Sequence, residues 1–406
     1  MLWSPVVTGE VARAARERGL EVAERLRGWS GGESGLEGAA GVAVLFGQLD
    51  RVFPEECWDV PAHQALAAAA RAVEETGRTV PGLYSGLSGV AAAADLLSRD
   101  GTRYGGLLST LDARIAAETA TRSERLTNSP AHQPFETFDV ISGLSGTNRY
   151  LLDRDLAKLE GVVAVCGFSP DGPNWFTPPK ALRAGTPLAE RYREGVYNCG
   201  LAHGIAGPLA VLSIAFQAGH VVPGQTEGIA AVADWLIAHR VDDEWGVNWA
   251  AGVGPNQDCA PAHSAWCYGG PGVARALWLA GTALADSKLQ DQALETMAAI
   301  FRRPWSARQI GHSPGLCHGV AGLLQITLRF AAETGEPMFT EAAGELTERL
   351  LELYRPDVAT GYYTITNRET VRPHAGLLDG AAGAALALLA ATTSVEPVWD
   401  RLLLLS

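Results

Sequence analysis

The stretch Gly315-Leu316-Cys317-His318-Gly319-Val320-Ala321-Gly322, followed by the apolar segment Leu323–Phe330, is one copy of the pattern that decides the fold. In this pattern a Gly-x-x-Gly tetrapeptide introduces a short apolar stretch, and seven copies occur along the chain. The paired glycines are Gly38/Gly41, Gly86/Gly89, Gly143/Gly146, Gly204/Gly207, Gly269/Gly272, Gly319/Gly322 and Gly380/Gly383. Successive copies begin 48 to 65 residues apart, a period that fits a helical hairpin with its loops.

The apolar segments after the glycines are hydrophobic on nearly every side, which indicates buried helices. Amphipathic helical stretches lie between them, such as Thr226–His239 and Thr340–Tyr354, so buried and surface helices alternate as in two concentric layers. The last apolar helix, which contains Ala-Leu-Ala-Leu-Leu at residues 385–389, has no polar face, and closure onto the first repeat would cover it. We therefore predict an all-α fold, an α/α toroid of seven helical hairpins that forms a single domain over residues 1–406.

Two regions depart from the hairpin rhythm. Residues 167–195 are rich in proline and aromatic residues, which predicts an irregular insertion. The segment Thr360–Val371 alternates β-forming residues around Asn367-Arg368, which indicates a short β-hairpin. Either region could border a substrate groove.

Composition narrows the class of protein. The 406 residues carry a net charge of −13, which argues against nucleic acid as a partner because phosphate binding needs a basic surface. No apolar run approaches the roughly 18 residues that a membrane span needs, and the N-terminal region lacks the pattern of a signal peptide, so we expect a cytoplasmic protein. In such a chain the six cysteines favour metal or catalytic duty over disulfides.

Three potential metal ligands occupy equivalent points of adjacent repeats. Cys267 stands two residues before Gly269, and Cys317-His318 immediately precede Gly319. If equivalent positions are neighbours in space, the three side chains converge. Two thiolates and one imidazole form a three-ligand zinc set with an open fourth position, which is the catalytic arrangement.

Two other interpretations of these ligands stay open. Each cysteine taken alone could be a small buried hydrophobic residue, the usual fate of a free cysteine. The site could also be a closed structural zinc site in which Cys259, His263 or His312 supplies the fourth ligand.

Three further residues could take part in the chemistry. His203 aligns with His318 in the repeat frame, which favours a general acid or base over a purely structural histidine. Asp139 stands four residues before Gly143, where it could orient a histidine or cap the N-terminus of the next helix. Tyr268 follows a potential ligand and could donate a hydrogen bond to the site or serve only in packing.

At these residues the chain resembles the lanthionine synthetase C-like family, the zinc-dependent lantibiotic cyclases. The resemblance runs through all seven copies, and its most specific motifs are Trp266-Cys267-Tyr268-Gly269, Cys317-His318-Gly319 and Ala202-His203-Gly204. The tyrosine after the first cysteine resembles the stand-alone bacterial cyclases. The resemblance implies that Cys267, Cys317 and His318 bind one Zn²⁺ per chain, with His203 and Asp139 as the acid–base pair.

The resemblance has one departure. Such cyclases often carry an arginine four residues before the first zinc cysteine, and here that position is His263. The spacing to Cys267 equals one helical turn, so His263 could face the open zinc position and take over the role of the arginine.

The implied activity is that of a lanthionine synthetase acting on a dehydrated precursor peptide with its leader. A peptide cysteine would occupy the open zinc position as a thiolate and add to the β-carbon of dehydroalanine or dehydrobutyrine. The resulting enolate would be protonated by His203 or by a zinc-bound water. The implied partners also include a dehydratase and an export transporter.

Two rival functions stay open. One is a zinc hydrolase that ionises water at the fourth position, although two thiolate ligands make a less acidic metal than the usual His and carboxylate set. The other is a non-cyclising scaffold that keeps the zinc and binds a thiol such as glutathione.

Overall fold

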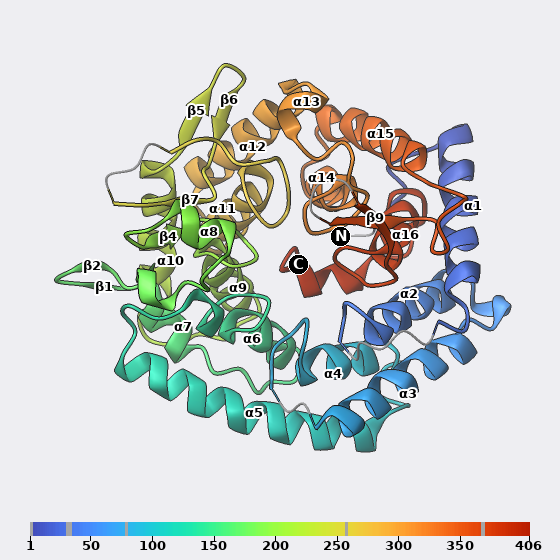
Figure 1. Ribbon diagram of the computed structural model, residues 1–406, viewed down its shortest axis with the longest axis horizontal. Helices are drawn as coiled ribbons and strands as arrows, with labels where there is room; N and C mark the ends of the chain where they lie inside the picture. Colours follow the sequence, from blue (N-terminus) through green and yellow to red (C-terminus); the bar gives the residue numbers. More distant parts are fainter. Residues whose placement is uncertain (1–2, 30–34, 78–79, 256–258, 367–369) are drawn as a thin grey trace. The chain divides into compact units, whose positions relative to one another are not determined.

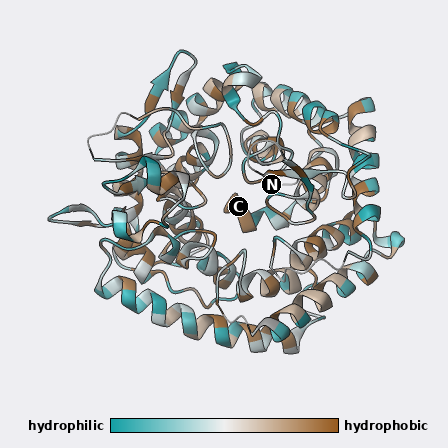
Figure 2. Cartoon of the chain, viewed as in Figure 1, coloured by the Kyte–Doolittle hydropathy of each residue, from teal (hydrophilic) through white to brown (hydrophobic). Residues whose placement is uncertain are grey.

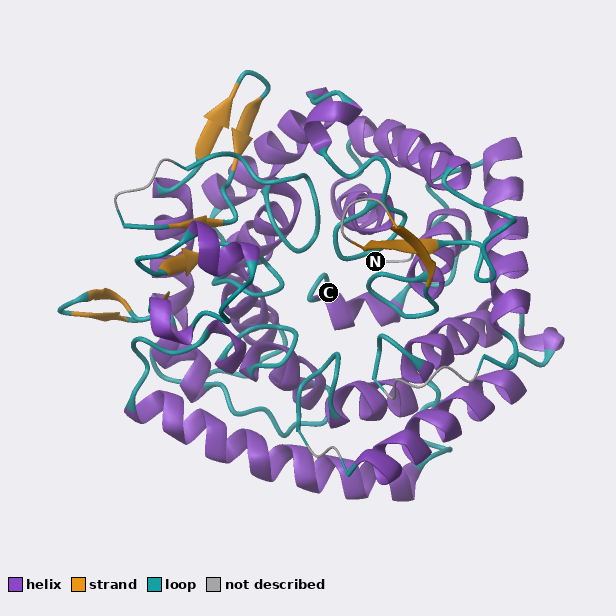
Figure 3. Cartoon of the chain, in the orientation of Figure 1, coloured by secondary structure: helices purple, strands orange, loops and turns teal. Residues whose placement is uncertain are grey.

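Helices make up most of the protein, as the computed structural model shows (Figure 3). The structure describes all residues except 1–2, 30–34, 78–79, 256–258 and 367–369. The chain forms two compact units. Unit 1 comprises Met1–Val80, Tyr84–Leu111 and Trp305–Arg401, and unit 2 comprises Pro81–Leu83, Asp112–Pro304 and Leu402–Ser406. That the whole chain is a single domain stays a prediction.

Unit 1 is built from helices of the first two and the last two repeats (Figure 1). Its helices are α1 (Gly9–Leu26), α2 (Ala39–Val52), η1 (Pro54–Glu56), α3 (Asp59–Thr76), α4 (Leu87–Leu96), the start of α5 (Gly105–Asn128), α13 (Trp305–Arg308), α14 (Val320–Thr334), α15 (Pro337–Glu352), α16 (Ala381–Thr392) and most of η4 (Val398–Leu403). Its two strands, β8 (Tyr363–Thr366) and β9 (Thr370–Pro373), pair antiparallel.

The last apolar helix of the chain is covered by the first repeat, as the sequence predicts. Every residue of α16 is buried, and the helix packs against α1, α2 and α14. The indole N–H of Trp3 donates to the carbonyl of Ala390 over 3.0 Å, and the backbone N–H groups of Val6 and Val7 both donate to the carbonyl of Ala391. Figure 2 shows the contrast in hydropathy between α16 and the amphipathic helices α1 and α15. The N-terminal segment therefore removes the apolar surface of α16 from water.

Unit 2 holds the three middle repeats and the short strands between residues 168 and 253. Its helices are the larger part of α5, η2 (Phe135–Thr137), α6 (Leu144–Leu152), α7 (Glu160–Val165), η3 (Pro179–Ala181), α8 (Pro187–Arg191), α9 (Ala206–Gln217), α10 (Gln225–Ala238), α11 (Gly270–Leu284) and α12 (Ser287–Arg302). The apolar helix α9 packs against α6, α7, α10 and α11, and α11 packs against α12.

The strands are short, and those at residues 241–253 lie outside the two regions where the sequence predicts a departure from the hairpin rhythm. In unit 2, β1 (Phe168–Ser169) pairs with β2 (Gly172–Pro173), β3 (Phe176–Thr177) pairs with β4 (Val196–Asn198), which also pairs with β7 (Gly252–Val253), and β5 (Val241–Asp243) pairs with β6 (Gly246–Asn248). The region near residues 167–195 contains two-residue strands and short helices, and that it is an insertion stays a prediction. The β8–β9 hairpin confirms the one expected at Thr360–Val371, although its turn at Asn367-Arg368 lies outside the described residues.

Backbone hydrogen bonds join the loops that lead into the Gly-x-x-Gly copies. We call the three residues before the first glycine of each copy its entry loop. In unit 2 the N–H of Val140 donates to the carbonyl of Ala202, and the N–H of Ala202 donates to that of Cys267. In unit 1 the same relation runs from Cys317 to Leu378, from Leu377 to Leu36 and from Leu36 to Tyr84. Within each unit, equivalent positions of adjacent repeats are therefore neighbours in space.

The second glycine of each copy allows this close approach. A Cβ atom at Gly146 would lie 1.9 Å from the carbonyl oxygen of Val140, and one at Gly272 would lie 2.2 Å from that of Trp266. Both separations are far below any real contact, so a side chain would push the entry loop off its helix. Among the described residues, no helix is both long and apolar enough to cross a bilayer.

Candidate functional site

Asp139 and His203 form a close pair in unit 2. Asp139 is fully buried, and its Oδ2 lies 2.6 Å from Nδ1 of His203. Its Oδ1 accepts the backbone N–H groups of Ser142, at 2.8 Å, and Gly143, at 2.7 Å, immediately before α6. The sequence left open whether Asp139 caps a helix or orients a histidine. The structure shows both contacts at once, because each carboxylate oxygen serves a different one.

The pairing selects which nitrogen of His203 is available. An ionised Asp139 only accepts hydrogen bonds, so Nδ1 of the imidazole carries the proton and Nε2 of the neutral ring is an acceptor. The side chain of His203 is 34% exposed, and the ring of Phe135 in η2 meets it edge-on at 5.4 Å. His203 is therefore held by a buried carboxylate yet open enough to exchange a proton with another molecule.

Glu136 is a neighbour of this pair that sequence reasoning missed. Its carboxyl group is half-buried, and among the described residues its buried Oε2 has no hydrogen-bond partner. Burial raises the pKa of Glu136, as does the nearby charge of Asp139, while a bond to its own backbone and the nearby His203 lower it. The sequence signal was only its position three residues before Asp139, which does not by itself indicate burial.

Cys267 stands in the entry loop before α11. It follows Trp266, which is fully buried, and precedes Tyr268, which is partly buried. Its side chain is 5% exposed, and its Sγ lies 3.6 Å from Nε2 of His263. Burial lowers the pKa of His263, which favours its neutral form. The structure thus places His263 beside the predicted zinc ligand, although residues 263–267 form a loop and not the helical turn that their spacing suggested, and a role in place of the arginine stays a prediction.

Tyr268 is tied into the loops around Cys267. Its hydroxyl accepts a hydrogen bond from the amide of Asn198 at 3.2 Å, and its ring lies against Gly200, where a Cβ would be 2.6 Å from the ring edge. Its ring also meets that of His263 edge-on, with centroids 6.2 Å apart. Packing therefore accounts for much of its position, and a role in the chemistry stays a prediction.

Cys317 and His318, both partly exposed, stand in the entry loop before α14 in unit 1. The backbone N–H of Cys317 donates to the carbonyl of Leu378 over 3.0 Å, which holds this loop against that of the next repeat. Nδ1 of His318 lies 3.4 Å from Oδ1 of Asp379. A carboxylate on one ring nitrogen directs the other toward a metal, as is usual for histidine ligands. Sequence reasoning missed Asp379, although it aligns with His318 in the repeat frame.

The chemistry of the donor set fits zinc. Among the described residues, the group that could hold a metal ion consists of Cys267, Cys317 and His318. Two thiolates and one imidazole suit zinc and exclude the oxygen-seeking cations Ca²⁺ and Mg²⁺. Cys259, His263 and His312, the candidates for a fourth ligand, do not belong to this group.

These features describe an all-α protein with a thiolate-rich metal group and a histidine held by a carboxylate. Residues 31–404 match the family of lanthionine synthetase C-like proteins, and the chain belongs to this family.

Two relatives show how far the similarity extends. The chain is 23% identical to the nisin biosynthesis protein NisC of Lactococcus lactis subsp. lactis over 343 residues, which are 80% of this chain and 81% of that protein. Its structure is similar to that of nisin cyclase, with a TM-score of 0.80 and 21% identity, over 96% of this chain and 97% of the other.

The comparisons confirm the predictions of fold and enzyme class. The likeness to nisin cyclase confirms the α/α toroid expected from the repeats. Membership of the family confirms that the protein is a lanthionine synthetase of the cyclase type.

Proposed function

We propose that the protein is a zinc-dependent cyclase that forms lanthionine and methyllanthionine rings in a precursor peptide. The observation that carries this proposal is the buried Asp139 that holds Nδ1 of His203 at 2.6 Å, while a backbone hydrogen bond joins the entry loop of His203 to that of Cys267. A proton carrier and a metal ligand therefore stand in adjacent repeats of one unit.

Cys267, Cys317 and His318 would hold the zinc, one ion per chain, with Asp379 supporting His318 and His263 beside Cys267. When bound, zinc lowers the pKa of a thiol that takes its fourth position, so that the peptide sulfur reacts as a thiolate. We assign the remaining steps to residues of the chain.

His203 would carry the proton. Nε2 accepts a proton only while Asp139 keeps the proton of the neutral ring on Nδ1. The peptide thiol gives its proton to Nε2 of His203, its sulfur bonds to the β-carbon of dehydroalanine or dehydrobutyrine, and the electron pair of the C=C bond passes to the enolate. The α-carbon then receives a proton from the His203 imidazolium, so the peptide keeps its mass. Holding both ends of the ring in one place offsets the entropy of closure.

The dehydrated residues of the substrate must be made by an earlier reaction. Dehydroalanine and dehydrobutyrine arise from serine and threonine by loss of water, so a dehydratase must act on the leader-bearing peptide before this enzyme. We propose that the reaction takes place in the cytoplasm, where the thiols of the peptide stay reduced. An export transporter as a further partner stays a prediction from the family resemblance.

Mass spectrometry of a model peptide with one cysteine and one dehydroalanine tests this function. We expect the zinc-loaded protein to leave the peptide mass unchanged while removing its reaction with a thiol-alkylating reagent. Cys317→Ala should lose zinc and cyclisation, whereas Cys57→Ser, at an exposed cysteine, should keep both. A gain of water would indicate a hydrolase. Unchanged zinc in Cys317→Ala would refute the ligand assignment.

A further inference from the structure

The end of α5 in unit 2 borders a cavity that none of the steps above uses. It has a volume of about 480 Å³ and is lined by Arg122, Arg125 and Leu126 of α5 and by Ser129, Gln133 and Thr137 of the segment that follows. We call it the Arg122–Arg125 cavity. Among the described residues, two guanidinium groups and no carboxylate line it, in a protein whose net charge is −13. Its lining is therefore suited to a negatively charged ligand.

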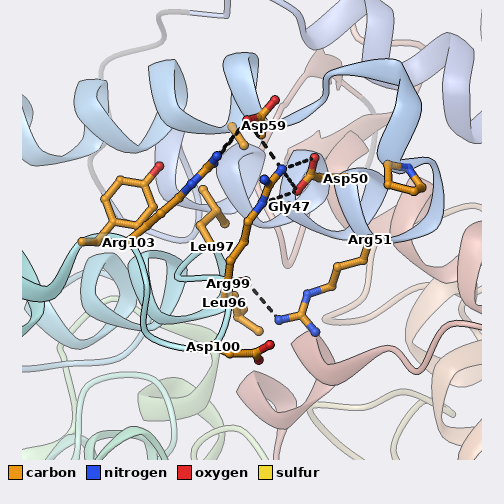
Figure 4. A pocket seen from close by; sticks show the side chains of 12 residues that line it. Gly47, Asp50, Arg51, Asp59, Leu96, Leu97, Arg99, Asp100 and Arg103 are labelled. Carbon is orange, nitrogen blue, oxygen red and sulfur yellow. Dashed lines mark hydrogen bonds and ion pairs between the residues drawn. The ribbon is translucent and has the colours of Figure 1, made fainter.

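A cavity of similar size in unit 1 shows the opposite electrostatics (Figure 4). It has a volume of about 460 Å³, and its arginines face carboxylates. Nη2 of Arg99 lies 2.8 Å from Oδ2 of Asp50, and Nη1 of Arg103 lies 3.2 Å from Oδ2 of Asp59. In this cavity the carboxylates of Asp50 and Asp59 balance the arginine charges, so no bound anion is needed there.

Arg122 and Arg125 of the Arg122–Arg125 cavity form no ion pair of this kind among the described residues. Arg122 is half-buried, and its Nη1 donates to the carbonyl of Ser142 over 3.1 Å. Burial lowers the pKa of Arg122, and the nearby charge of Arg125 lowers it further, against the opposing effects of Glu118 and Asp139. Among the described residues the guanidinium of Arg125 makes no hydrogen bond or ion pair. Two like charges three residues apart on a helix repel each other, and an anion between them would relieve that repulsion.

Favourable interaction with the end of α5 explains only part of this arrangement. A cation in the last turn of a helix is stabilised by the helix dipole, which accounts for Arg125. It does not account for a second arginine one turn earlier, half-buried and facing the same cavity. Other lining residues are also held in place, since Gln133 donates to the carbonyl of Ser129 over 2.9 Å and Thr137 donates to that of Pro134 over 2.7 Å. Such preformed walls are typical of binding sites.

The cavity adjoins the residues to which we assign proton transfer. The carbonyl of Ser142 accepts from Arg122, while the N–H of the same residue donates to Asp139. Thr137 of the cavity belongs to η2, whose Phe135 packs on the ring of His203. The cavity is therefore linked to Asp139 through Ser142 and to His203 through η2.

We propose that the Arg122–Arg125 cavity binds a carboxylate of the substrate peptide, either an Asp or Glu side chain or the C-terminal carboxylate. Paired guanidinium groups suit this ligand, because each offers N–H donors in a planar fork that matches a carboxylate. The proposal rests on the proposed function for the identity of the ligand as a peptide.

Binding is tested apart from cyclisation with unreactive fluorescent peptides that carry serine in place of dehydroalanine. One pair differs by Glu against Gln, and a second pair by a free against an amidated C-terminus. Fluorescence anisotropy should show about tenfold tighter binding of one carboxylate form by the wild type, the size of one charge-assisted hydrogen bond. The pair that shows the difference identifies the source of the carboxylate.

Arg125→Gln should abolish this preference, because Arg125 is exposed and its loss removes a cation without opening the core. Arg114→Gln changes an exposed arginine of the same helix that does not line the cavity, and it should keep the preference. With a cyclisable peptide, Arg125→Gln should raise KM about tenfold and leave kcat unchanged. Equal affinities for all four peptides, no binding at all, or a preference that survives Arg125→Gln would overturn the proposal. The preference without any cyclisation would refute only the proposed function.

Discussion

Replacing Asp139 by asparagine separates its two contacts, which the structure assigns to different oxygens. The asparagine oxygen can still accept the N–H groups of Ser142 and Gly143, so the cap before α6 persists. The second oxygen becomes an NH₂ group, which can only donate. The neutral ring of His203 must then present a bare Nδ1 to it and carry its proton on Nε2, which can no longer accept one.

The contacts set the expected size of each effect. Hydrogen bonds to a charged group contribute about 1.5–3 kcal/mol each, so Asp139→Ala, which loses both backbone bonds, should lower the free energy of unfolding by about 3–6 kcal/mol. Asp139→Asn keeps both bonds in neutral form and should cost only about 1–2 kcal/mol. Its cyclisation rate should nevertheless fall by about 10²- to 10⁴-fold, the usual contribution of a positioned acid–base group.

The assay is the thiol-alkylation mass measurement described above, run beside thermal unfolding and zinc analysis. Asp171→Asn serves as the matched control, because Asp171 is an exposed carboxylate in the turn between β1 and β2 of the same unit. We expect wild-type zinc content in all three variants. A folded Asp139→Asn protein that cyclises at the wild-type rate would show that the carboxylate is only a helix cap, and the proton-transfer role of His203 would fall with it.

Three further predictions concern His203, His263 and Glu136. His203→Asn should keep its zinc and slow cyclisation by about 10²- to 10⁴-fold, and loss of zinc would instead identify His203 as a ligand. His263→Ala should weaken turnover but retain zinc, because its ring contacts Cys267 without belonging to the metal group, so zinc loss would indicate a closed structural site. Glu136 has a raised pKa, so the folded state binds its proton more tightly than the unfolded state, and this stabilisation is present below pH 4.5 and lost as pH rises through the raised value. Glu136→Gln should therefore flatten the fall of thermal stability in that window, and an unchanged slope in calorimetry would contradict the burial of this carboxylate.

Much of the site could be predicted because the repeats carry it. The zinc set was inferred from Cys267, Cys317 and His318 at equivalent positions, and the hydrogen bonds between entry loops show within each unit why equivalence means proximity. His203 was found by the same alignment. Glu136 and Asp379 were not found, because a carboxylate near a helix start is usually a cap or a solvated charge.

The sequence by itself determined the alternation of buried and surface helices, since six apolar segments after Gly-x-x-Gly can be stabilised only by burial. The glycines of the sequence also mark where an entry loop packs closely on its helix, because the carbonyl of that loop occupies the space of a side chain at Gly146 and Gly272. Only the tertiary structure decided that one oxygen of Asp139 caps α6 while the other meets His203, and that Arg122 and Arg125 share a cavity with no carboxylate among its described lining residues. Those facts depend on side-chain direction and on distances between elements remote in the chain, which local propensity and periodicity do not encode.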